Sequence, residues 1–204
     1  MTPEQKTEFL DQSRMHFAAD MLLRGTYAAK DADDFKGCSV GCHLRHIMTT
    51  ATVEQIKNID DKHRRVANYY GYPEWLALLQ DSIFEGLPNG ESAKWHVLLA
   101  ESLAKTPADY DWQAALHRVH AAILRISYKT AGTAQEVVNR ILDLHERAGR
   151  GEKVTDELWS AAESAAESAA RSAAESAARS AARSAAYREI RDGVLVALAA
   201  GECS

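Results

Sequence analysis

The residues best suited to chemistry in this chain lie in one short segment, residues 37–46. It contains two of the three cysteines and two of the eight histidines. Thiol and imidazole side chains act as nucleophiles, redox groups or soft metal ligands. The first hypothesis is therefore a zinc site, with donor atoms from four residues: Cys38, Cys42, His43 and His46. Cys42 and His46 would share one face of a helix.

The spacing of these residues also allows other sets of ligands for a metal site. Structural zinc sites usually draw on two ligand pairs separated by a longer loop. His117 and His120 stand in a second His-x-x-His spacing and could supply the distant pair. His16 and Asp20, on the first predicted helix, could join a metal site inside a helical bundle, although a surface pair is the favoured interpretation.

A second hypothesis treats the segment as an anion-binding loop with an activated thiolate. Gly37 and Gly41 permit unusual backbone angles, and a helix that begins near Cys42 would direct free N–H groups toward the loop. This setting would lower a cysteine pKa and hold a phosphate or carboxylate beside Arg45. Six residues separate Cys38 from Arg45, one more than in the Cys-x5-Arg loop of phosphatases.

Two further interpretations of the segment remain open. Cys38, Cys42 and His43 form a rare spacing variant of the covalent haem attachment motif. Alternatively, the small cysteines and glycines let a tight loop pack against helices, while the histidines cap helix ends or face solvent.

Helices must position these residues, because no segment shows the sustained alternation of a strand. Thr2–Gln5 and Thr133–Glu136 match capping boxes, each followed by apolar residues at helical spacing. The cysteine segment falls at the N-terminal end of a helix. From Trp112 to Ile126, apolar residues recur in steps of four and three, which predicts a seam against other helices. The expected fold class is all-α, a helical bundle.

A repeat dominates the last third of the chain. From Ser160 to Tyr187 the unit Ser-Ala-Ala-x occurs seven times. Alanine is the best helix former, and Glu-to-Arg steps of four residues add favourable pairs. We predict one long helix from about Thr155 to at least Arg191, and two domains. These are a helical domain at residues 1–150, which carries the cysteine segment, and a Ser/Ala-rich helical arm at residues 151–204.

The composition of the chain limits the partners and the cellular location that we expect. The chain has 204 residues and a formal net charge of −5, with no broad basic surface pattern, so nucleic-acid binding is not expected. The N-terminus lacks the pattern of a secretory signal, and no apolar stretch is long enough to cross a bilayer. We expect a cytoplasmic protein with reduced thiols.

Three motifs carry a resemblance. They are Gly-Cys-Ser-Val-Gly-Cys at residues 37–42, Tyr-Pro-Glu-Trp-Leu-Ala at 72–77 and Asp-Ser-Ile-Phe-Glu-Gly-Leu-Pro-Asn at 81–89. Together with the Ala-rich tail, they resemble a group of small, functionally uncharacterised bacterial and phage proteins. The resemblance implies a prokaryotic or phage cytoplasmic setting and no activity.

Two function classes follow from these patterns. The favoured one is a helical binding or regulatory protein that acts on a protein partner, or forms a homodimer through the C-terminal helix, with a possible zinc site in the cysteine segment. The alternative is a small thiol- or metal-dependent enzyme that acts on an anionic small molecule at the loop of Gly37 and Gly41. No complete catalytic constellation decides between them.

Overall fold

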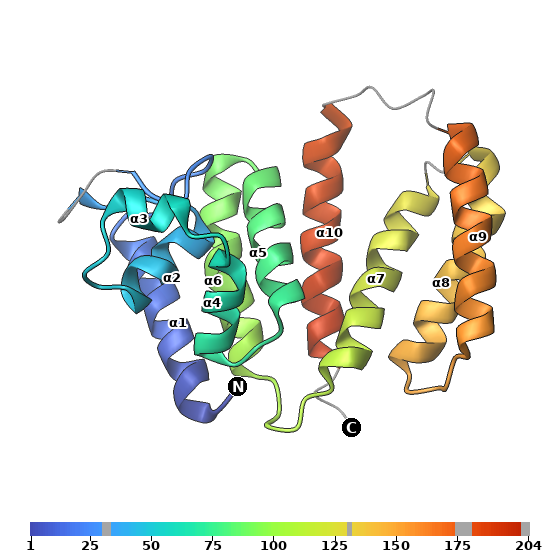
Figure 1. Ribbon diagram of the computed structural model, residues 1–204, viewed down its shortest axis with the longest axis horizontal. Coiled ribbons are helices and arrows are strands. Elements are labelled where there is room, and N and C mark those ends of the chain that lie inside the picture. Colours follow the sequence, from blue (N-terminus) through green and yellow to red (C-terminus); the bar gives the residue numbers. More distant parts are fainter. Residues whose placement is uncertain (30–33, 130–131, 174–180, 201–204) are drawn as a thin grey trace. The chain divides into compact units, whose positions relative to one another are not determined.

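The computed structural model of the chain describes residues 1–29, 34–129, 132–173 and 181–200 (Figure 1). Within these residues ten α-helices and no strand form, which confirms the predicted all-α class. None of the described helices has the length and apolar composition needed to cross a membrane. The chain divides into two compact units: unit 1 spans Met1–Ala108 and unit 2 spans Asp109–Ser204.

Unit 1 contains six helices: α1 (Pro3–Ala18), α2 (Ser39–Ile47), α3 (Val53–Asn58), α4 (Lys62–Tyr70), α5 (Glu74–Gly86) and α6 (Asn89–Ala104). Helix α1 begins with the predicted capping box, in which Thr2 and Gln5 exchange hydrogen bonds. The short helix α2 packs against α1, α4 and α5, and α1 packs along α6. Because α2 is surrounded, its residues from Ser39 to Leu44 are all buried.

The core of unit 1 is built from large apolar and aromatic side chains. Its largest fully buried members include Phe9, Tyr70, Phe84, Trp95 and Leu99. Full burial of one such aliphatic or aromatic side chain stabilises a fold by about 1.5–3 kcal/mol. The polar residues that share this interior must therefore be positioned by hydrogen bonds, since an unpaired buried polar group costs free energy.

Two glycines let a loop cross the beginning of α2. Residues of this loop pair through backbone hydrogen bonds, including Leu23 N–H to the Gly37 carbonyl at 2.8 Å. A Cβ at Gly41 would lie 1.7 Å from the carbonyl oxygen of Tyr27, and one at Gly37 would lie 2.4 Å from the same oxygen. Both positions therefore require glycine for a close backbone contact.

Unit 2 contains α7 (Trp112–Tyr128), the 3-10 turn η2 (Gly132–Ala134), α8 (Gln135–Gly149), α9 (Asp156–Ala173) and α10 (Ala181–Ala199). Helix α7 packs against both α8 and α10, and α9 packs against α8. Helix α8 begins at Gln135, with Ala134 at its N-cap, and the side chain of Thr133, on which the predicted capping box depends, lies outside the described part of the structure.

The Ser-Ala-Ala repeat is helical where it is described, in α9 and at the beginning of α10. Residues 174–180 of the predicted long helix lie outside the described residues. Both helices pack within unit 2, which begins at Asp109, so the boundary of the compact units differs from the predicted division at residue 150. The physical reason is that α10 ends in an apolar segment, whose Val194 and Leu198 are buried.

Candidate metal centre

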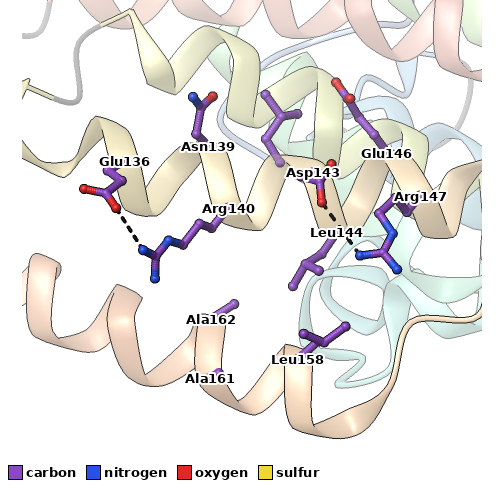
Figure 2. Close-up of a pocket in the computed structure, with 11 residues that line it drawn as sticks. Glu136, Asn139, Arg140, Asp143, Leu144, Glu146, Arg147, Leu158, Ala161 and Ala162 are labelled. Atoms are coloured by element: carbon purple, nitrogen blue, oxygen red, sulfur yellow. Dashed lines mark hydrogen bonds and ion pairs between the residues drawn. The ribbon is translucent and has the colours of Figure 1, made fainter.

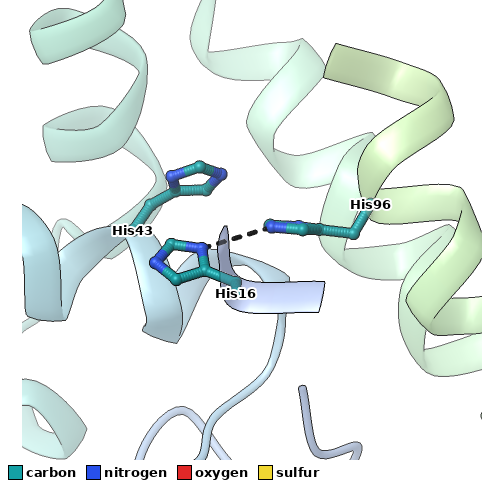
Figure 3. A group of neighbouring side chains, drawn as sticks. All are labelled: His16, His43 and His96. Carbon is teal, nitrogen blue, oxygen red and sulfur yellow. Dashed lines mark hydrogen bonds between the residues drawn. The ribbon is translucent and has the colours of Figure 1, made fainter. Parts of the chain in front are cut away.

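Three histidines from three helices meet in the interior of unit 1: His16 on α1, His43 on α2 and His96 on α6 (Figure 3). One nitrogen of each ring lies within 4.8 Å of a nitrogen of the other two. The exposed fractions of the three residues are 1%, 0% and 0%. We call these residues the histidine triad.

Local sequence places each ring inside. His16 stands in the last turn of α1, and His43 lies in the middle of the buried stretch of α2. His96 lies on the apolar face of α6, which also buries Trp95 and Leu99. Phe9 stacks on the His43 ring with centroids 4.5 Å apart, which fixes the plane of that imidazole.

The rings contact one another through their inward nitrogens. His16 Nδ1 lies 3.4 Å from His96 Nε2, as drawn in Figure 3. The ring centroids of His43 and His96 are 4.9 Å apart. Ser13 Oγ lies 3.4 Å from His43 Nε2 and is the nearest hydroxyl on that side of the ring.

Hydroxyl groups hold the outer nitrogens of two rings. His96 Nδ1 lies 2.7 Å from Ser39 Oγ, and His43 Nδ1 lies 3.1 Å from the Tyr70 hydroxyl. Ser39 Oγ also accepts a hydrogen bond from Gln80 Nε2 at 2.5 Å, and Gln80 Oε1 accepts one from the Tyr72 hydroxyl at 3.0 Å. Such partners on the second nitrogen are what orients a metal-binding histidine.

Burial keeps the triad uncharged. Desolvation, followed by repulsion from the neighbouring histidines, holds the pKa of His43 and that of His96 well below the ordinary value. Desolvation lowers the pKa of His16 to about 4. Neutral imidazole is the form that coordinates a metal, because its unprotonated nitrogen carries the lone pair.

The four ligands predicted from the cysteine segment do not gather around one point in the described structure. Only His43 belongs to the triad, and only Cys38 belongs to a second group that is described below. The His46 ring turns outward, where its Nε2 lies 2.8 Å from a carboxylate oxygen of Glu8. The Cys42 thiol lies 3.5 Å from two backbone carbonyl oxygens, those of Met21 and Gly37.

The predicted anion loop has a different role in the structure. The Tyr27 carbonyl occupies the space beside Gly37 and Gly41, so the glycines serve close packing. Arg45 donates hydrogen bonds to the carbonyls of Thr49 and Ala51. The Tyr27 carbonyl oxygen, packed against the start of α2, leaves little room for an added anion.

The thiols of Cys38 and Cys42 are buried, and neither is activated. Desolvation raises the pKa of Cys42 to about 12 and also raises that of Cys38 well above its ordinary value. An activated thiolate requires the opposite shift. This finding argues against an activated thiolate at Cys38 or Cys42.

His117 and His120 lie in unit 2, where they meet His145 of α8 and Trp159 of α9. His117 Nδ1 is 2.9 Å from His145 Nδ1, and the ring centroids of His120 and His145 are 4.8 Å apart. Trp159 stacks on His117 with centroids 5.5 Å apart. We call His117, His120 and His145 the unit 2 histidines.

Sequence reasoning named His16 only as a less favoured metal ligand, and it missed His96. His16 was expected in a surface pair with Asp20, but Asp20 pairs with Lys36 while His16 is buried. His96 was not singled out, although its position between Trp95 and Leu99 on the apolar face of a predicted helix was a usable signal. A histidine on an apolar helix face needs polar partners from another element, and the sequence does not name them.

Unit 2 contains a pocket between α8 and α9 (Figure 2). It has a volume of about 680 Å³ and is lined by residues of α8 and α9. Within α8, Arg140 pairs with Glu136 at 2.8 Å and Arg147 with Asp143 at 3.8 Å, and Glu146 pairs with Arg125 at 2.7 Å. The charged side chains that line the pocket are therefore held in ion pairs.

The histidine triad is thus the best-formed chemical site in the described residues. Comparison of the chain with protein-family models, curated protein sequences and solved structures found no match. The geometry of unit 1 therefore carries the functional argument.

Proposed function

We propose that unit 1 is a metal-binding helical module in which the histidine triad holds one transition-metal ion, with zinc as the expected metal. The observation that carries the proposal is the convergence of three neutral, fully buried imidazoles from three separate helices. Imidazole nitrogen suits zinc, copper, iron and nickel, and three neutral nitrogens do not suit magnesium or calcium.

The distances fit a tetrahedral ion. Ligand nitrogens about 2.0–2.1 Å from zinc, at tetrahedral angles, lie about 3.3 Å from one another. His16 Nδ1 and His96 Nε2 are already 3.4 Å apart. The remaining separations, which reach at most 4.8 Å, close by small rotations of the rings.

Hydrogen bonds among the three imidazole rings satisfy the donors and acceptors of these rings poorly. Each neutral imidazole offers one donor and one acceptor. The inward contact of 3.4 Å between His16 and His96 is longer than an ordinary hydrogen bond of about 2.7–3.2 Å. With Nδ1–H of His43 and His96 donated to hydroxyl oxygens, both Nε2 lone pairs face the centre and an ion replaces the weak inward contacts.

The ion would connect α1, α2 and α6 and so stabilise the fold of unit 1. A site that forms only in the folded state converts binding free energy into folding free energy. Three protein ligands leave one position for water, a small anion or the nearby Ser13 hydroxyl. We therefore favour a binding or regulatory protein whose stability responds to a metal ion, and a protein partner remains a prediction.

The test is metal binding by the full chain after removal of metal with a chelator. Zn²⁺ binding is followed by calorimetry, and Co²⁺ is added as a probe because its visible absorption reports tetrahedral nitrogen ligands. The test variants are His43→Gln and His96→Gln. The matched control is His46→Gln, three residues along the same helix and outside the triad.

The wild-type chain and H46Q should bind one ion at the triad with equal affinity and show the Co²⁺ spectrum. H43Q and H96Q should bind one Zn²⁺ ion fewer than the wild-type chain and lose the Co²⁺ spectrum of the triad, and Zn²⁺ should raise their melting temperature less than that of wild type. Helical circular dichroism identifies a variant that fails to fold, and H16N then serves as a milder third variant. No Co²⁺ spectrum with wild type, or equal binding by H43Q and H46Q, would overturn the proposal.

A further inference from the structure

We infer that unit 1 carries a second cation site of different chemistry, formed by Cys38, Asp81 and Glu85, which binds a thiophilic divalent ion such as zinc or cadmium. The thiol sulfur and one oxygen of each carboxylate lie within 4.8 Å of one another. Cys38 is the N-cap of α2, and the two acids stand one helical turn apart on α5.

The Asp81 carboxylate has unused acceptor capacity directed at buried space. Its Oδ2 accepts a hydrogen bond from the Tyr27 hydroxyl at 3.0 Å and lies 3.1 Å from His63 Nε2. Its Oδ1 is buried and has no hydrogen-bond partner among the nitrogen and oxygen donors described. The Cys38 thiol hydrogen-bonds to the Asp81 carboxylate. A cation bound in place of the thiol proton would also supply a partner for the buried Oδ1.

The positively charged side chains nearby do not neutralise the carboxylates of Asp81 and Glu85. Arg24 donates to the backbone carbonyl of Glu85, while the Glu85 carboxylate accepts the Gly25 N–H at 2.8 Å. Lys62 lies over the Tyr27 ring, 4.8 Å from its centroid. Among the described ion pairs, only that with His63 involves either acid.

The donor set selects the kind of ion. Two carboxylates and a thiolate supply negative charge and one soft ligand, which suits zinc and cadmium and excludes magnesium and calcium as the preferred ions. Binding would displace the thiol proton to solvent, because the coordinating form is the thiolate. His63 would remain on Asp81 as an orienting partner or join as the fourth ligand.

The site is separate from the histidine triad but adjoins it along the chain. Cys38 precedes Ser39, which contacts His96, and Asp81 follows Gln80, which donates to Ser39. The hydrogen bond between Ser39 and Gln80 thus lies between the two donor sets. The inference does not rest on the triad, since its ligands, its charge and its spectroscopic signature are different.

The test uses Cd²⁺ alone as the probe, because thiolate-to-cadmium charge transfer absorbs in the ultraviolet. All proteins are the full chain with Cys203→Ser, so that the third thiol contributes nothing. The variants are Cys38→Ser and Asp81→Asn, with Cys42→Ser as the matched control, since Cys42 is the other buried thiol of α2. Serine at position 38 can still accept the Gly41 N–H that caps the helix.

We expect the absorption band in the parent chain and in C42S, and its loss in C38S. We expect D81N to bind Cd²⁺ more weakly by roughly tenfold or more. H43Q should keep the band, so failure of the triad and failure of this site give different results. The inference is overturned if the parent chain shows no band, if the band disappears in C42S instead, or if D81N binds as tightly as the parent. Should C38S not fold by circular dichroism, the D81N result decides.

Discussion

Replacing Gly41 by alanine should strongly destabilise unit 1. The added Cβ would lie 1.7 Å from the carbonyl oxygen of Tyr27, and 2.6 and 3.0 Å from two further backbone atoms of that residue. An ordinary contact of a Cβ is about 3.4–4 Å. Relief would therefore require a displacement of more than 1 Å between the loop and the start of α2.

The magnitude follows from the type of neighbour. An extra methyl group in a well-packed core costs about 1–3 kcal/mol when side chains can adjust. At Gly41 the neighbouring atoms belong to the backbone, which cannot adjust as a side chain does. We therefore expect a destabilisation of at least about 3 kcal/mol, the upper end of that range. The gain in helix propensity from glycine to alanine, about 1 kcal/mol, is smaller. For a unit of this size the net loss of at least about 2 kcal/mol corresponds to a lower melting temperature by roughly 8–16 °C.

Gly90→Ala is the matched control, because it lies in α6 and a Cβ there meets no atom within 4 Å. Urea unfolding of the full chain, combined with hydrogen exchange of peptides from α2, measures the effect on unit 1. G90A should be at least as stable as wild type, while G41A should lose protection across α2. If G41A matches wild type in both measurements, the close approach of Tyr27 and the reasoning built on it are refuted.

Three further predictions concern buried polar groups. Desolvation and neighbouring histidines lower the pKa of His145 to about 4 from 6.5, so the unfolded chain binds this proton more readily. Unit 2 should therefore be most stable above pH 6.5 and lose stability as the pH falls toward 4, by roughly 1 kcal/mol because the ring is partly exposed to solvent. Urea unfolding measured as a function of pH should show a flatter profile for His145→Gln. Gln80→Leu leaves the buried Tyr72 hydroxyl without its acceptor and should lower the free energy of unfolding by about 2–3 kcal/mol in the same assay. Adding Tyr72→Phe should restore part of this stability. A double variant no more stable than Q80L would contradict the prediction. In the native chain Cys38 and Cys42, whose pKa values are raised by burial, should alkylate near neutral pH only as fast as unit 1 opens. Rapid labelling located by peptide mapping would contradict the burial of these two thiols.

Local sequence patterns were sufficient for the fold class and for the beginning of the first helix. The capping box at Thr2 and Gln5 and the absence of alternating segments predicted an all-helical chain and the observed start of α1, which ends at Ala18. These features depend on residues within one or two turns of each other, so the sequence contains them directly. The structure places Ala134 at the N-cap of α8, one residue after the Thr133 that the sequence pattern suggested.

The sequence by itself determined that helices form, that the Ser-Ala-Ala repeat is helical where it is described, and that thiols and imidazoles cluster in residues 37–46. Only the tertiary structure decided which of these groups meet. His16 and His96 stand 80 positions apart in sequence and come into contact because α1 packs along α6. Neighbours in sequence are separated instead, since successive residues of a helix point in different directions: His43 faces the core while His46 faces Glu8. A site formed by packing of helices that are distant in the sequence has no fixed spacing between its ligands. For that reason the sequence pattern pointed to the short cysteine segment and not to the histidine triad.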